Sequence, residues 1–268
     1  MRRQLLVVSL KGGVGKTTIT VGLAQALSRR GFKVGLLDLD YRSPTAPLLL
    51  APEGVAPLGR TEDDALVPPC VKGIYLFSMG MIWPPDKAVM VEDDLAVEDV
   101  RQLLTPGVIA WPEGLDFLCV DSPPSSSGIV TTALAMPHLT GAIVVTHPSS
   151  LSRAALLRTL DLLAEKQVPV YALVSNQGYT VTGEPRFDLT DAAIQEVASA
   201  YHIPLFWAIP HDSNLAQYFV ALANRFLATE PVLLPAPEEP VGSQWEQIMA
   251  ATRKLTQVFG KSSAKLKT

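Results

Sequence analysis

The feature that most constrains this chain is a glycine-rich loop between an apolar run and a helical pattern. Residues 5–9 are apolar and predict a short buried strand. The loop 12–18 reads Gly-Gly-Val-Gly-Lys-Thr-Thr, and residues 17–30 predict a helix that ends before Gly31. A strand, a glycine loop and a helix in this order are the context that a phosphate-binding loop requires. We therefore expect an α/β fold that holds phosphate groups at this loop.

The rest of the chain continues the alternation of strands and helices. Apolar runs predict further strands at residues 34–38, 74–78, 117–121, 142–146, 170–175 and 205–208. Helical patterns lie at residues 97–104, 152–166, 190–201 and 214–228. This alternation predicts a mostly parallel, doubly wound sheet with helices on both faces.

Two proline-rich stretches interrupt this pattern. Residues 51–69 lack periodicity and predict a surface loop. Residues 231–240 carry four prolines and predict a linker into a last helix over 243–259. We therefore expect a P-loop ATPase domain over residues 1–230, followed over 231–268 by a linker and a C-terminal helix with a basic tail.

Composition and charge exclude several classes of protein. Hydrophobic residues make up 48% of the chain and charged residues 18%, which excludes a disordered chain. The net charge of −4 gives no strong nucleic-acid signal. Two cysteines cannot form a disulfide framework, and no run of about 18 apolar residues predicts a transmembrane helix. We expect a cytoplasmic protein.

The phosphate loop predicts the ligand. Glycines let backbone amides turn toward phosphates, and the start of the following helix adds a favourable dipole. Lys16 would contact the β- and γ-phosphates of ATP, or the β-phosphate of ADP, and the Thr17 hydroxyl would bind Mg²⁺. The nucleotide-binding residues expected here are Gly12, Gly13, Val14, Gly15, Lys16, Thr17 and Thr18.

Acidic residues follow two of the predicted strands. Asp38 and Asp40 lie at the end of the second strand, and Asp121 ends the apolar strand 117–121. Ligands of open parallel sheets bind beyond the carboxyl ends of the strands, so these carboxylates should face the loop. Asp121 would hold Mg²⁺ through water. Each aspartate could instead cap a helix or a turn.

Three segments resemble one family. In residues 10–18, Leu10 stands where the general P-loop pattern has its first glycine, and Lys11 precedes Gly12. This resembles the deviant Walker A motif of the MinD/ParA/Mrp class of dimeric ATPases. Asp-Leu-Asp-Tyr-Arg-Ser-Pro-Thr-Ala-Pro at 38–47 and Leu-Asp-Phe-Leu-Cys-Val-Asp-Ser-Pro-Pro at 115–124 resemble the Mrp type of this class. The likeness extends over residues 5–228.

The resemblance implies roles for particular residues. Lys11 would reach across an ATP-bridged homodimer to the partner's phosphates and, with Lys16, act in catalysis; it could also be a solvated loop lysine. Asp38 would join Thr17 and Asp121 around Mg²⁺, and Asp40 would orient the attacking water. The residues expected to frame the adenine are Asn176, Pro210 and Asp212, which could equally be ordinary loop residues.

The sequence also departs from the family. Mrp-type iron–sulfur carriers have a Cys-x-x-Cys pair after the asparagine, but residues 177–184 contain no cysteine. Cys119 falls in a predicted buried strand, which leaves Cys70, so we do not expect an iron–sulfur cluster by this route. Ser125 replaces a glycine of the family's switch, which suggests slow hydrolysis.

These observations favour a slowly hydrolysing, nucleotide-gated homodimeric ATPase that recruits or regulates an unknown protein partner. One alternative is an Mrp-like iron–sulfur or metal assembly ATPase. Another is a MinD/ParA-like positioning ATPase on membrane or nucleoid. Its membrane anchor would be the C-terminal helix, a reading that we do not favour because a membrane-binding helix would carry more basic residues. A fourth reading is a nucleotide-binding scaffold that no longer hydrolyses ATP.

Overall fold

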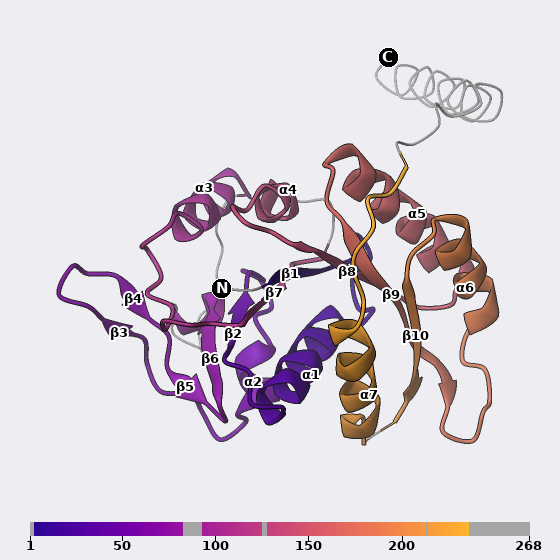
Figure 1. Ribbon diagram of the computed structural model, residues 1–268, viewed down its shortest axis with the longest axis horizontal. Coiled ribbons are helices and arrows are strands. Elements are labelled where there is room, and N and C mark those ends of the chain that lie inside the picture. The colour runs from indigo at the N-terminus through magenta and orange to yellow at the C-terminus, as the bar shows by residue number, and fades with distance from the viewer. Residues whose placement is uncertain (1–2, 83–92, 125–127, 213, 236–268) are drawn as a thin grey trace, which may run out of the picture. The chain divides into compact units, whose positions relative to one another are not determined.

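A computed structural model describes residues 3–82, 93–124, 128–212 and 214–235. Its centre is an eight-stranded sheet with the order β10-β9-β8-β1-β7-β2-β6-β5 (Figure 1). Neighbouring strands pair in parallel, except that β5 pairs antiparallel with β6. The strands are β1 (Arg3–Val8), β2 (Val34–Asp38), β5 (Cys70–Val71), β6 (Ile74–Ser78), β7 (Phe117–Asp121), β8 (Gly141–Thr146), β9 (Val170–Thr180) and β10 (Leu205–His211).

Helices cover both faces of this sheet, as Figure 1 shows. One face packs against α1 (Lys16–Arg29), α2 (Ala46–Leu50) and α7 (Ala216–Leu227). The other packs against α3 (Asp93–Leu103), α4 (Gly128–Leu134), α5 (Ser150–Glu165) and α6 (Asp191–Ala200). A short 3₁₀ helix, η1 (Met79–Met81), follows β6. The doubly wound α/β fold expected from the sequence is therefore confirmed.

The central strands are apolar because both of their faces are covered. All five residues of β2 and of β7 are buried, as a parallel sheet between two helix layers requires. The register places Asp38 of β2 beside Asp121 of β7, and Asp121 beside Val7 of β1. The carboxyl ends of β1, β7 and β2 thus meet where the glycine loop begins.

Several elements differ from the prediction. Residues 51–69 contain a small antiparallel pair, β3 (Gly59–Arg60) and β4 (Leu66–Val67), rather than only loop. Backbone hydrogen bonds between Leu66 and residues 108 and 110 hold this pair to the body of the protein. The helices α2 and α4 were not predicted, because each is too short for a helical period to show. β9 and β10 run longer than predicted and stay paired as far as Thr180 and His211.

Some predictions fall outside the described residues. The compact unit runs from Met1 to Leu234. The C-terminal helix, with its possible membrane role, and Ser125 lie among residues that the structure does not describe. Within the described ranges, no helix is long and apolar enough to cross a membrane.

Candidate nucleotide-binding site

The glycine loop joins the end of β1 to the start of α1. Gly13 and Gly15 have φ values of 76° and 90°, a left-handed conformation that favours glycine. Gly15 also precedes the first turn of α1, where no side chain caps the free backbone N–H groups and which itself contains no acidic residue. Uncapped N–H groups at a helix start can bind an anion. The loop therefore has the backbone geometry of a phosphate cradle.

Asn176 braces this loop from β9. Its side chain is 1% exposed, and Nδ2 donates a hydrogen bond of 2.8 Å to the carbonyl oxygen of Val14. A Cβ added to Gly15 would lie 2.3 Å from Nδ2, so a glycine is needed at this contact. The sequence did not predict this structural role. The expected contact of Asn176 with adenine stays a prediction.

Asp121 connects the sheet to α1. Its Oδ2 accepts a hydrogen bond of 2.6 Å from the Thr17 hydroxyl, and its Oδ1 accepts one of 3.0 Å from the Thr20 hydroxyl. Thr20, three residues after Thr17 and on the same side of the helix, was not among the predicted site residues. The spacing of the two threonines could have revealed it.

Asp38 is the second buried carboxylate of the site. Its Oδ1 accepts a hydrogen bond of 3.0 Å from the backbone N–H of Asp40. Its Oδ2 accepts bonds from the Ser78 hydroxyl at 2.9 Å and from the backbone N–H of Ala46 at 3.3 Å. Burial, followed by the nearby charge of Asp121, raises the pKa of Asp38 to about 8. Burial also raises the pKa of Asp121 to about 6, although hydrogen bonds from two threonines lower it.

The buried carboxylates fit a hard divalent cation. Mg²⁺ prefers oxygen ligands, and Thr17, Asp38 and Asp121 supply a hydroxyl and two carboxylates. The hydrogen bond brings Thr17 to Asp121, and the strand register places Asp38 beside Asp121. A cation here would stabilise the ionised form of both acids, which burial disfavours. The assignment of these three residues as metal ligands stays a prediction.

Lys16 is buried at the first position of α1. It is 6% exposed, and burial lowers its pKa, while the carboxylates of Asp121 and Asp40 act in the opposite direction. The other lysine of the loop, Lys11, is half-buried, and its backbone N–H donates to the Ser9 hydroxyl at 3.3 Å. The two lysines thus lie at the two ends of the loop, one inside the protein and the other partly in solvent.

Asp40 lies at the mouth of the site. It is half-buried, and its Oδ1 accepts hydrogen bonds from the backbone N–H groups of Arg42 at 3.1 Å and Ser43 at 3.0 Å. These bonds hold the turn after β2. The adjacent Tyr41 is buried, and its hydroxyl donates to Oδ2 of Asp99 in α3 at 2.6 Å. The sequence did not predict this contact, which links the Asp40 turn to a helix.

The remaining predicted residues lie at the end of β10 or in the sheet. Pro210 is buried in β10, and Oδ1 of Asp212 accepts a bond from the Asn214 backbone at 2.9 Å. Cys119 is fully buried in β7, and burial raises the pKa of its thiol to about 12. Cys70 is exposed on β5. In the described part of the chain, no three His, Cys, Asp or Glu side chains form a metal-binding group.

The fold and this loop define a P-loop NTPase, and comparison with solved structures agrees. A nucleotide-binding protein in complex with ADP from Archaeoglobus fulgidus is 27% identical, with a TM-score of 0.65 over 84% of this chain and 87% of that one. The septum site-determining protein MinD with Mg-ADP from Pyrococcus horikoshii is 20% identical, with a TM-score of 0.57 over 84% and 89% of the two chains. The second likeness shows the fold alone.

Comparison with protein-family models shows which family of P-loop NTPases the chain belongs to. The model of the NUBPL iron-transfer P-loop NTPases, in the ParA group, matches residues 1–251. The chain belongs to this family. Its resemblance to Mrp-type proteins, inferred from three sequence segments, is confirmed, and an ATPase activity is consistent with the family and its nucleotide-bound neighbours.

Curated relatives carry the name iron-sulfur cluster carrier protein. The one from Rickettsia felis is 31% identical over 238 residues, covering 89% of this chain and 70% of the relative. The one from Aquifex aeolicus is 28% identical over 248 residues, covering 91% and 65%. The chain thus spans about two thirds of the length of these relatives. Their names do not support our expectation that an iron–sulfur cluster is unlikely, and they favour the iron–sulfur assembly alternative over the general switch.

Proposed function

We propose that this chain is a Mg²⁺-dependent ATPase that acts as an ATP-bridged homodimer in iron–sulfur cluster transfer. The observation that carries the ATPase part is the hydrogen bond between Thr17 and Asp121, which joins the phosphate loop to the acid at the end of β7. The family and the names of the relatives support the transfer part.

In this proposal, each group at the site has one task. The backbone N–H groups of residues 12–18 and the Lys16 ammonium hold the β- and γ-phosphates. Thr17, Asp38 and Asp121 hold Mg²⁺, which neutralises charge as the γ-phosphoryl group is transferred. Lys11 supplies a second cation to the phosphates of the partner subunit. The Asp40 carboxylate orients a water for attack on the γ-phosphorus.

Hydrolysis would then change the dimer. Loss of the γ-phosphate removes the contact that Lys11 makes across the interface, so the two subunits separate or open. ATP binding therefore biases an equilibrium between open and closed dimers, and a partner protein reads the closed state. The switch ties the release of cargo to hydrolysis.

The cluster is the cargo of this switch, and thiolates are its usual ligands. We propose Cys70 as the contact with the cargo, because it is exposed while Cys119 is buried with a raised pKa. A homodimer supplies two copies of Cys70, and the remaining ligands would come from the donor or acceptor protein.

Anaerobic reconstitution tests the cargo assignment. Iron and sulfide are counted per dimer in the wild type, Cys70→Ser and the matched control Cys119→Ser. We expect a stoichiometric cluster in the wild type and the Cys119 variant, and its loss in the Cys70 variant. Absence of a cluster from all three proteins, or an unchanged cluster in Cys70→Ser, would overturn this assignment. ATP hydrolysis by the same samples tests the ATPase part separately.

A further inference from the structure

A groove separates α3 from α4 on the face of the sheet opposite α1. Its volume is about 610 Å³, and its walls include Val97 and Leu104 on one side and Ala135 and Met136 on the other. This volume lies within the range of about 300–1,000 Å³ that small-molecule sites occupy. The groove does not include any residue assigned to the nucleotide site.

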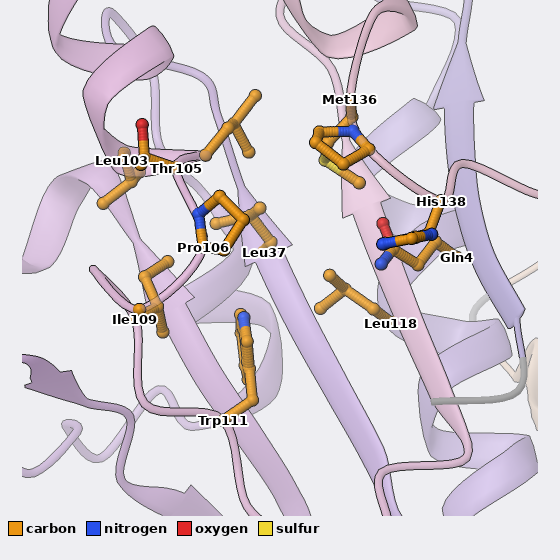
Figure 2. Close-up of a pocket in the computed structure, with 13 residues that line it drawn as sticks. Gln4, Leu37, Leu103, Thr105, Pro106, Ile109, Trp111, Leu118, Met136 and His138 are labelled. Carbon is orange, nitrogen blue, oxygen red and sulfur yellow. The ribbon is translucent and has the colours of Figure 1, made fainter.

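An inner chamber of about 240 Å³ lies against the sheet beneath this groove. Figure 2 shows Leu37 of β2, Leu118 of β7 and the ring of Trp111 around it. Groove and chamber adjoin, because they share part of their lining, and we call the two together the α3–α4 cleft. The shared residues are Leu104, Thr105, Pro106, Met136 and Pro137. Because most of the lining is apolar, an apolar ligand would gain packing contacts in this chamber.

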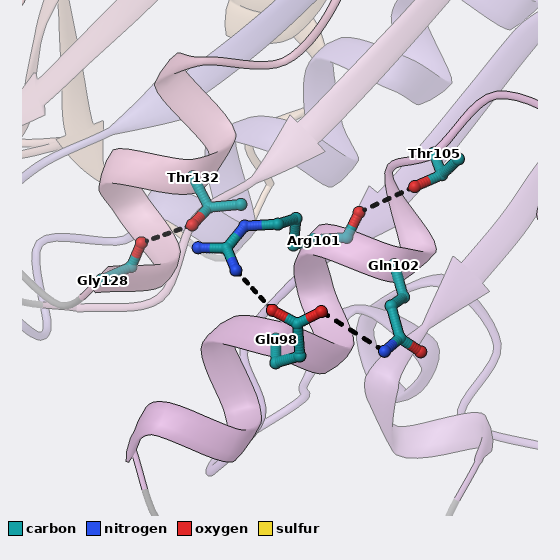
Figure 3. A network of polar contacts seen from close by, with 6 residues as sticks. All are labelled: Glu98, Arg101, Gln102, Thr105, Gly128 and Thr132. Carbon is teal, nitrogen blue, oxygen red and sulfur yellow. Dashed lines mark hydrogen bonds and ion pairs between the residues drawn. The ribbon is translucent and has the colours of Figure 1, made fainter.

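The charged group of the cleft is a cation. Arg101 lines the groove and reaches from α3 toward Thr132 of α4, with Glu98 holding it in an ion pair (Figure 3). Gln102 donates a second hydrogen bond to Glu98 at 3.4 Å. Among the described residues that line groove and chamber there is no Asp or Glu, although the whole chain has a net charge of −4. The charged side chain that the described lining contributes is thus a cation, and an anion bound there would compete with Glu98 for it.

From these features we infer that the α3–α4 cleft binds a small, mainly apolar organic acid and that its occupancy is coupled to the nucleotide site. The apolar body of the acid fills the chamber beside Trp111, and its anionic group meets Arg101 at the groove.

The coupling rests on the proposed function and on two connections. Oδ2 of Asp99 in α3 accepts the Tyr41 hydroxyl, and Asp93 pairs with Arg42 at 2.5 Å, so α3 is tied to the turn that carries Asp40. The other wall, α4, starts at Gly128, shortly after Asp121.

At Gly128 the two helices are in close contact, since a Cβ there would lie 2.5 Å from Cγ2 of Val97. If a bound nucleotide moved the Asp40 turn or the segment after Asp121, the distance between α3 and α4 would therefore change, and with it the width of the cleft.

Fluorescence titration of the full chain with 1-anilinonaphthalene-8-sulfonate, an aromatic acid, tests the site. We expect one saturable site per chain, energy transfer from Trp111 that Trp111→Phe removes, and displacement by decanoate. Ala135→Trp, which fills the groove, and Arg101→Gln should each weaken binding at least about tenfold. Glu98→Gln, which removes the carboxylate that competes for Arg101, should not weaken binding, and Val181→Trp, outside the cleft, should leave binding within about twofold.

Thermal unfolding confirms that each variant is folded. Binding that Ala135→Trp and Arg101→Gln leave unchanged would overturn the site.

The coupling has its own measurement. Mg-ADP should change the affinity for the probe by at least about threefold, and the probe should change the affinity for Mg-ADP by the same factor. Tyr41→Phe should reduce both changes without loss of nucleotide binding. If the probe binds in the cleft but neither ligand changes the affinity for the other, the coupling is overturned. An ATPase-inactive protein that still binds the probe would refute the proposed function and leave the site itself standing.

Discussion

The Thr17 hydroxyl donates a hydrogen bond of 2.6 Å to Oδ2 of Asp121, across 104 residues of sequence. The first residue stands in the phosphate loop, and the second ends a buried strand of the sheet. Their contact fixes the start of α1 against β7 and places a hydroxyl next to a carboxylate, two of the oxygen groups that the proposed magnesium site uses.

Replacing the hydroxyl of Thr17 tests its role. Thr17→Val keeps the branched shape but removes the hydroxyl proposed to bind magnesium. We therefore expect kcat to fall by roughly 100-fold, the scale of losing one group that stabilises transition-state charge. Thr17→Ser retains the hydroxyl and should keep most of the activity. Steady-state ATPase assays over a magnesium series measure both variants. Full activity in Thr17→Val would contradict the assignment.

The two loop lysines should separate binding from assembly. Lys16→Met keeps the buried aliphatic stem but removes the charge. It should weaken ATP binding by roughly 10- to 100-fold, as loss of a charge-assisted hydrogen bond predicts. Lys11→Met should leave the affinity of one subunit nearly unchanged but prevent the ATP-bridged dimer. Calorimetric titration measures the ATP affinity of each variant, and sedimentation measures dimer formation. If the two variants changed both quantities equally, the two lysines would not have distinct roles.

Stability should depend on pH through Asp38. Its pKa in the folded protein, about 8, exceeds the value of about 4 expected for the unfolded chain, so the folded state keeps a proton that the unfolded state releases. The free energy of unfolding without magnesium should therefore fall as pH rises from about 4 to about 8.

Urea denaturation at about pH 5 and about pH 8 should show a smaller change for Asp38→Asn than for the wild type. A variant with the full pH dependence would show that another group causes it.

Gly15 and Gly13 form a matched pair for testing the brace that Asn176 provides. Alanine at either position pays for a left-handed backbone, about 1–2 kcal/mol. At Gly15 the new Cβ would also lie 2.3 Å from Nδ2 of Asn176, whereas at Gly13 no atom lies within 4 Å. Gly15→Ala should thus lose about 1–3 kcal/mol more free energy of unfolding than Gly13→Ala. If urea denaturation gave equal losses of unfolding free energy for the two variants, the Asn176 side chain would be able to move away from the new Cβ at little cost.

Local pattern was enough to predict the strands that carry the site. The apolar runs of β2 and β7 end in Asp38 and Asp121, and parallel pairing brings such ends together, so their meeting at the loop could be expected. Thr17 follows from the loop motif itself. Asp38, Asp121 and Thr17 can therefore each be predicted from the few residues around them in the sequence.

What the sequence could not predict depends on contacts between distant segments. Asn176 reaches the loop from β9 across 162 residues, and nothing near it in sequence marks a brace. Tyr41 reads as an ordinary apolar position until α3 brings Asp99 to it. The α3–α4 cleft arises because two short helices leave space between them, which no local period reports.

The most direct test of the central claim is sedimentation velocity of Asp40→Asn with Mg-ATP. This variant keeps the proposed phosphate and metal ligands but lacks the carboxylate proposed to orient water, so ATP should persist and hold two subunits together. We predict a stable dimer with Mg-ATP and a monomer with Mg-ADP, and loss of the dimer when Lys11→Met is added. A monomer in every nucleotide state would contradict the nucleotide-gated dimer.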